Sequence, residues 1–213
     1  YLWGTGRLGR GLTVVVAASD ATAAEKAGAD YICNGAGDQE EIQAAIDLLY
    51  GTEAATKLGG TVQLTSGKYK TTGTINHYRT TGGLTKDVHI SVVLRGVGRA
   101  GGPLNPSDVA VNQGGTIIEA QSSFGDVIQV GTGNTYYHYG SGIDGLTVAA
   151  LATMGNTTAG IRIYKTQAYL INDVDTWHQY KGIVTEVNSN GNIVNTQVND
   201  VGIHPATGLA GAA

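Results

Sequence analysis

The sequence predicts an all-β solenoid, a parallel β-helix closed at its start by an N-terminal helix. Glycine is very frequent (33 of 213 residues), proline is rare (3) and only 14% of residues are charged. After residue 59, short runs of Val and Ile recur with no helical pattern between them. Gly-Ile pairs begin at positions 142, 160, 182 and 202, so they recur at intervals of roughly 20 residues. Such a period is typical of a solenoid.

Composition excludes several classes of function. The chain has 13 basic and 17 acidic residues and no Lys/Arg cluster, which argues against nucleic acid as a partner. A single Cys excludes a disulfide framework and a zinc site built on cysteines. No apolar run is long enough to span a bilayer as a helix, so no membrane insertion is predicted. The five His show no metal-ligand spacing, and we therefore predict no metal and no cofactor.

Residues 1–58 are predicted to form an N-terminal strand and a capping helix. The β-branched run at 13–17 predicts the strand, and residues 20–30 could add one or two helical turns. From Asp38 to Tyr50 an apolar stripe follows helical spacing. Asp38 with Glu41 three residues on predicts a capping box at the start of this helix.

Residues 59–213 are predicted to form six or seven coils. The expected strands are 61–64, 88–94, 116–119, 127–130, 146–148, 161–164, 169–174, 183–186 and 193–198. Asn172 and Asn195 stand at matching positions of an internal echo, so we expect them to stack as a side-chain ladder. The chain starts at a Tyr and stops in small residues, and we expect the coils to continue beyond residue 213.

Residues 13–100 resemble the entry region of pectin-lyase-like, single-stranded right-handed β-helix proteins. The resemblance is carried by Ala29-Asp-Tyr-Ile-Cys33, the helix at 38–46, Gly59-Gly-Thr-Val-Gln-Leu-Thr-Ser-Gly-Lys-Tyr69 and Leu94-Arg-Gly-Val-Gly98. It implies an all-β fold, a right-handed parallel β-helix (solenoid) with an N-terminal α-helical cap.

This family includes polysaccharide lyases, glycoside hydrolases, phage tailspikes and other virion proteins, and the entry region here is similar to that of the virion-type members. The resemblance therefore implies a virion or extracellular location, and a homotrimer or contacts with other virion proteins. The paired-Asp, Gly-His-Gly and Arg-x-Lys motifs of polygalacturonases are missing, as are the Asp clusters and Arg-x-Pro-x-x-Arg pattern of pectate lyases. Whether the protein is an enzyme stays open, and the missing motifs argue against enzymatic activity.

Three acidic residues form the best candidate catalytic set. Asp173 and Asp175 are two residues apart, so in a strand they share one face, and Glu186 follows about half a coil later. Two carboxylates facing one groove could act as acid and base in glycoside hydrolysis. The alternative interpretation is a solvated outer strand face, which any such strand needs.

Aromatic residues are concentrated between residues 136 and 180. Tyr and Trp on a rigid surface suit sugar rings or a protein partner, because each has an apolar face and a polar edge. The predicted binding residues are Tyr136, Tyr137, Tyr139, Tyr164, Tyr169, Trp177, His178 and Tyr180. The alternative is that these rings stack along the outer wall or pack under a loop.

Two functions follow from the sequence. The favoured one is a structural or adhesion component of a virion, such as a tail fibre, tailspike or capsid-attached protein, which offers a rigid surface to a host glycan or a neighbouring subunit. The alternative is a polysaccharide lyase or glycoside hydrolase that uses the three carboxylates.

Overall fold

A computed structural model describes ten stretches of the chain. They are residues 12–51, 58–78, 90–100, 114–122, 124–131, 138–150, 158–164, 166–179, 181–186 and 197–205.

The strands form three sheets in which every pair is parallel. The nine-stranded sheet contains β1 (Leu12–Ala17), β2 (Tyr31–Ile32), β3 (Gly60–Leu64), β4 (Gly67–Thr71), β6 (Val92–Arg95), β7 (Thr116–Ala120), β10 (Gly142–Ala150), β13 (Leu170–Gln179) and β15 (Gln197–Pro205). The four-stranded sheet contains β5 (Ile75–His77), β8 (Ile128–Val130), β11 (Ala159–Ile163) and β14 (Lys181–Thr185). A two-stranded sheet pairs β9 (His138–Tyr139) with β12 (Thr166–Gln167).

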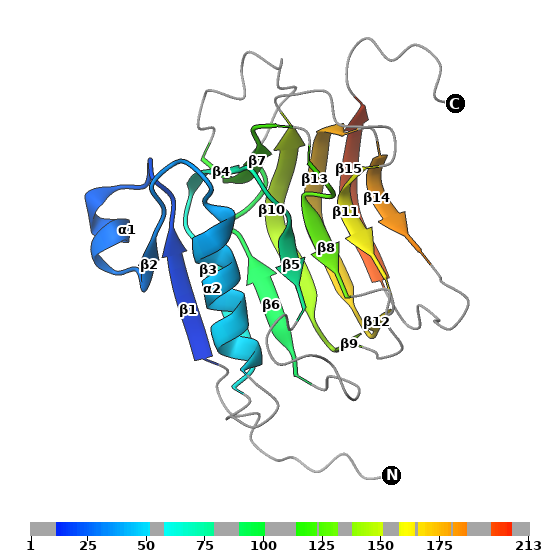
Figure 1. The fold of residues 1–213 in the computed structure, drawn as a ribbon, viewed down its shortest axis with the longest axis horizontal. Coiled ribbons are helices and arrows are strands. Elements are labelled where there is room, and N and C mark those ends of the chain that lie inside the picture. Colours follow the sequence, from blue (N-terminus) through cyan, green and yellow to red (C-terminus); the bar gives the residue numbers. More distant parts are fainter. Residues whose placement is uncertain are drawn as a thin grey trace.

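Two helices complete the described fold, α1 (Ala23–Ala27) and α2 (Gln39–Tyr50). Figure 1 shows the four-stranded sheet in front of part of the nine-stranded one, with α2 beside β5 in the same layer. The apolar face of α2 and the inward Val, Ile and Leu side chains of both sheets form one continuous core. Burial of this aliphatic surface is what holds the layers together.

The prediction of an all-β fold, a right-handed parallel β-helix, is wrong. The described residues form separate parallel sheets together with two helices, an α/β-like arrangement, and no closed solenoid is found among them. The distance along the chain between paired residues is also irregular. Ile161 pairs with Ile183, which agrees with the expected period, whereas Ile75 pairs with Ile128, more than two such periods later.

The Gly-Ile spacing misled because it joined strands of different sheets. Gly142 and Ile143 belong to β10 of the nine-stranded sheet and pair with Leu170 and Ile171. Ile161 belongs to β11 of the four-stranded sheet. Similarly, Asn172 pairs with Asn199 and not with Asn195, which lies outside the described residues.

Helix α2 is confirmed, but its predicted capping box is wrong. Asp38 makes no side-chain cap, because its carboxylate accepts the backbone amides of Gly35 and Lys70, both at 2.8 Å. A capping box is instead found at α1, where the side chains of Thr22 and Glu25 each accept the other's backbone N–H.

A sharp bend in β10 and β13 positions the polar groups described next. The first part of β10 pairs with β6, whereas the part after Gly145 pairs with β7. At the bend Gly145 has φ +64°, and Asp173 of the neighbouring strand has φ +52°, a conformation that costs energy for a residue with a side chain.

Candidate functional site

A row of polar side chains crosses the outer face of the nine-stranded sheet. Gln63, Arg95, Asp144, Asn172 and Asn199 occupy one register position on β3, β6, β10, β13 and β15. Neighbouring strands are about 4.8 Å apart, so side chains at one register position touch. Backbone pairing therefore places these groups in a fixed order.

The centre of the row is an arginine–carboxylate–amide group. Nε of Arg95 donates to one oxygen of Asp144 at 3.0 Å, and Nδ2 of Asn172 donates to the other oxygen at 3.0 Å. The Arg95 side chain is 48% exposed and that of Asp144 is 29% exposed. These groups are therefore held in place yet open to a ligand.

A hollow of about 220 Å³ lies beside this group. Its floor is Gly142, which pairs with Val93 on one side and Leu170 on the other. A Cβ at residue 142 would stand 2.7 Å from the carbonyl oxygen of Leu170, so glycine is required here. The hollow thus exists because Gly142 has no side chain at an outward position whose neighbours on both adjacent strands, Val93 and Leu170, are aliphatic.

Ser141 also borders the hollow, but its hydroxyl is engaged in the core. It lies 3.2 Å from the hydroxyl of Tyr50 and accepts the backbone amide of Val92 at 3.2 Å. Burial raises the pKa of the Tyr50 phenol well above its usual range. This pair fixes the edge of the hollow against α2.

Two of the predicted catalytic carboxylates lie together and share one arginine. Nε of Arg99 is 2.6 Å from Asp173, and its Nη1 is 3.2 Å from Asp175. Asp173 has its positive φ at the bend of β13. The guanidinium of Arg99 bridges the carboxylates of Asp173 and Asp175. The indole of Trp177 is buried nearby in a small cluster with Ala100, Ile117 and Ala149.

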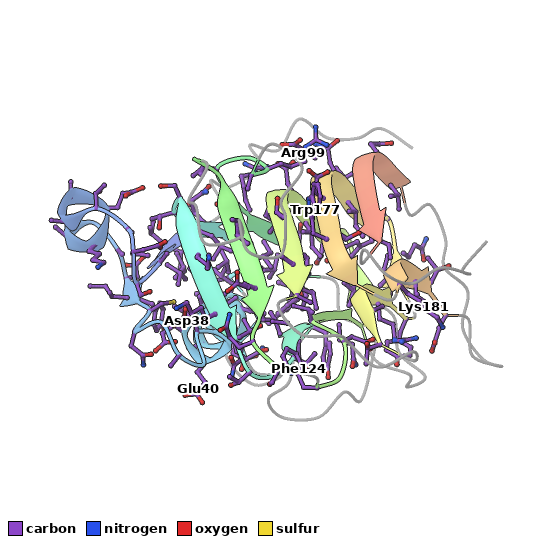
Figure 2. All side chains as sticks on the ribbon, turned by 90° about the horizontal axis from the view of Figure 1, so that it is seen from above. Asp38, Glu40, Arg99, Phe124, Trp177 and Lys181 are labelled. Carbon is purple, nitrogen blue, oxygen red and sulfur yellow. The ribbon has the colours of Figure 1, made fainter. Side chains whose placement is uncertain are left out.

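The third carboxylate, Glu186, is in a different place. It follows β14 of the four-stranded sheet and forms an ion pair with Arg162, whose Nε also holds buried Asp126 at 2.6 Å. The hydrogen bond to Asp126 raises the pKa of Arg162. Figure 2 places Arg99 and Trp177 on one side of the molecule and Phe124, two residues before Asp126, on the opposite side.

The predicted aromatic binding residues are not gathered on an exposed surface where the structure describes their side chains. Tyr169 is 1% exposed, Trp177 is 7% exposed, and Tyr164 is half-buried. Tyr139 belongs to β9 and His178 to β13. Tyr136, Tyr137 and Tyr180 lie outside the described residues.

Tyr169 has a clear role in the core. Its hydroxyl lies 2.5 Å from Nδ1 of His77, and the two rings meet edge to face with centroids 5.8 Å apart. Burial raises the pKa of the Tyr169 phenol well above its ordinary value. The pair joins β5 to the start of β13 across the interior.

Cys33, Asp38 and Glu41 form one further cluster of potential ligand atoms, within 4.8 Å of one another. Both Asp38 oxygens already accept backbone amides, and burial raises the pKa of the Cys33 thiol, so a thiolate is disfavoured. The cluster therefore serves the junction of α2 with β4 and is a poor metal site.

Sequence reasoning missed Arg95, Asp144 and the hollow. Arg95 stands in the Leu-Arg-Gly segment and Asp144 follows Gly-Ile, so each was visible as a polar residue after an apolar strand. Their pairing was hidden because 49 residues separate them.

No family model, no curated protein and no solved structure matches this chain. The resemblance of residues 13–100 to the pectin-lyase-like family thus stays an interpretation of the sequence. Neither helix in the described part of the chain has the length and apolar character needed to cross a bilayer.

Proposed function

We propose that the protein is a non-catalytic structural or adhesion component of a virion, whose rigid sheet face binds a surface polysaccharide. The observation that carries the binding role is the Arg95–Asp144–Asn172 group beside the hollow at Gly142. The virion location rests on the sequence resemblance alone.

Rigidity favours adhesion by this face. Its polar groups stand on paired strands whose inward neighbours, such as Leu94 and Ile143, are fully buried. Side chains already held by backbone pairing and by mutual hydrogen bonds lose little conformational freedom when a ligand binds. A flat, repetitive polymer such as a polysaccharide suits a fixed row of donors and acceptors.

The enzymatic alternative is less well supported. A glycosidase needs two carboxylates facing one substrate groove, one of them able to donate a proton. Here Asp173 and Asp175 are engaged by one guanidinium, and Glu186 is paired with Arg162 in the other sheet. Side-by-side trimerisation, which the resemblance implies, stays a prediction.

One experiment tests the proposal. The protein is incubated with a panel of purified surface polysaccharides, and binding is followed by affinity electrophoresis while new reducing ends and unsaturated products are measured in the same samples. We expect binding without release of oligosaccharides. If oligosaccharides appear and Asp175→Asn abolishes their release, the enzymatic alternative is correct and the non-catalytic proposal is wrong.

A further inference from the structure

We infer that the hollow at Gly142 is a subsite for one neutral hexopyranose residue of a polysaccharide. This inference rests on the proposed function and names its ligand class and location.

The shape suits a single sugar ring. Val93 and Leu170 flank Gly142 on the two adjacent strands, so their backbones stand roughly 10 Å apart with no side chain between them. The volume of about 220 Å³ is below the roughly 300–1,000 Å³ of clefts that enclose drug-sized ligands. The two aliphatic walls can pack on the C–H groups of a ring, and the open side lets a polymer continue along the sheet.

The polar edge has unused capacity for hydroxyl groups. Each Asp144 oxygen accepts one hydrogen bond, from Arg95 or from Asn172, and a carboxylate oxygen can accept two. Asp144 can therefore accept hydrogen bonds from adjacent sugar hydroxyls. The guanidinium of Arg95 has five N–H donors, of which Nε serves Asp144, and its exposed end can donate to a hydroxyl oxygen.

The charge balance favours a neutral sugar. Arg95 and Asp144 carry opposite charges in direct contact, so the pair presents no excess positive charge to an acidic ligand. A uronate in the hollow would place its carboxylate beside Asp144, and this like-charge contact discriminates against it. Neutral hydroxyls satisfy both members of the pair.

The test compares two variants of the walls with a matched control. Val93→Phe fills the hollow, and Leu170→Ala removes an exposed wall, since Leu170 is 41% exposed. Thr13→Phe adds the same ring to the same outward row two strands away, because Thr13 pairs with Thr61, which pairs with Val93. Binding to dextran and mannan, and to polygalacturonate as the acidic polymer, is measured by affinity electrophoresis, with thermal unfolding as a check on folding.

We expect the unaltered protein to bind a neutral polymer. Val93→Phe should weaken binding about tenfold or more because it blocks the hollow, and Leu170→Ala should weaken it similarly because it removes an apolar contact. Thr13→Phe should stay within about twofold of the unaltered protein. If both wall variants fold and bind as tightly as the unaltered protein, the subsite is wrong while adhesion stands. Binding to polygalacturonate alone would also overturn the neutral-sugar inference and leave adhesion intact. If the protein binds neither these three polymers nor any polysaccharide of the surface panel, both the subsite and the adhesion role are wrong.

Discussion

The side-chain amide of Gln43 pairs with the backbone of Asn76 in both directions. Its oxygen accepts the Asn76 amide at 2.8 Å, and its nitrogen donates to the Asn76 carbonyl at 3.1 Å. One residue of α2 thus reproduces the hydrogen bonds that a further strand would make to β5. Gln39 does the same in part for Thr72, accepting its amide at 3.0 Å. A strand edge that would otherwise be open to pairing is in this way covered by a helix.

Replacing Gln43 should therefore weaken the junction between α2 and β5. Gln43→Leu leaves both backbone groups of Asn76 without these partners, and we expect a loss of about 1–3 kcal/mol in the free energy of unfolding. Urea unfolding measures the loss, and amide exchange at Asn76 should become faster. Glu40→Leu is the control, because Glu40 is exposed on the same helix. Equal stability of Gln43→Leu and the unaltered protein would contradict this role.

Gly142 should tolerate no side chain. Gly142→Ala brings a Cβ to 2.7 Å from the Leu170 carbonyl, so strands β10 and β13 must separate locally. We expect destabilisation of about 1–3 kcal/mol by denaturant unfolding. Gly28→Ala is the matched control, since its Cβ would meet atoms no closer than 3.8 Å. A Gly142→Ala protein as stable as Gly28→Ala would show that the floor of the hollow is not tightly packed.

The two arginine pairs should differ sharply in their contribution to stability. Arg162→Met leaves Asp126, which is 9% exposed, without its cation, and we expect a loss of about 3–5 kcal/mol. Arg95→Met breaks a half-exposed pair and should cost less than about 1 kcal/mol. Chemical denaturation of both variants gives the comparison. Similar losses in the two variants would contradict the assignment of Arg162 to the core and Arg95 to a binding surface.

Stability should fall in alkaline solution because of the buried tyrosines. Burial raises the pKa of Tyr50, Tyr69 and Tyr169 above the ordinary value of 10.0. Above pH 10 the unfolded chain loses these protons while the folded protein keeps them, so unfolding becomes easier as pH rises. Below pH 10 the contribution is constant. Urea midpoints measured from pH 8 to about 11.5 should decline most steeply above pH 10, after a smaller decline from about pH 9 caused by the Cys33 thiol, whose pKa burial also raises.

Tyr169→Phe separates the effect of phenol ionisation on stability from the effect of ring packing. The variant should be less stable at pH 8, because His77 loses its hydroxyl partner in the core, by about 1–3 kcal/mol. It should also show a shallower alkaline decline, since one buried phenol is gone. Tyr31→Phe is the control, because the Tyr31 side chain is only partly buried. An unchanged alkaline slope in Tyr169→Phe would mean that another group causes the decline.

Local sequence patterns predicted many elements but few of their partners. The apolar stripe of Ile42, Ala45, Ile46 and Leu49 is buried in α2 as expected, and β-branched runs coincide with β1, β3 and β7. Strands β4 and β5 have no counterpart among the predicted strands, because their Lys, Tyr and Asn content weakens the pattern.

The sequence by itself determined where helix α2 and most strands lie, because side-chain periodicity and β-branching act over a few neighbouring residues. Only the tertiary structure decided which strands pair, and therefore the fold class. It also decided the hydrogen bond from the Lys70 backbone amide to Asp38 and the ion pair between Arg95 and Asp144. Parallel strands are joined by long connections, such as the one that separates Ile75 from its partner Ile128, and a connection of that length leaves no local signal of register.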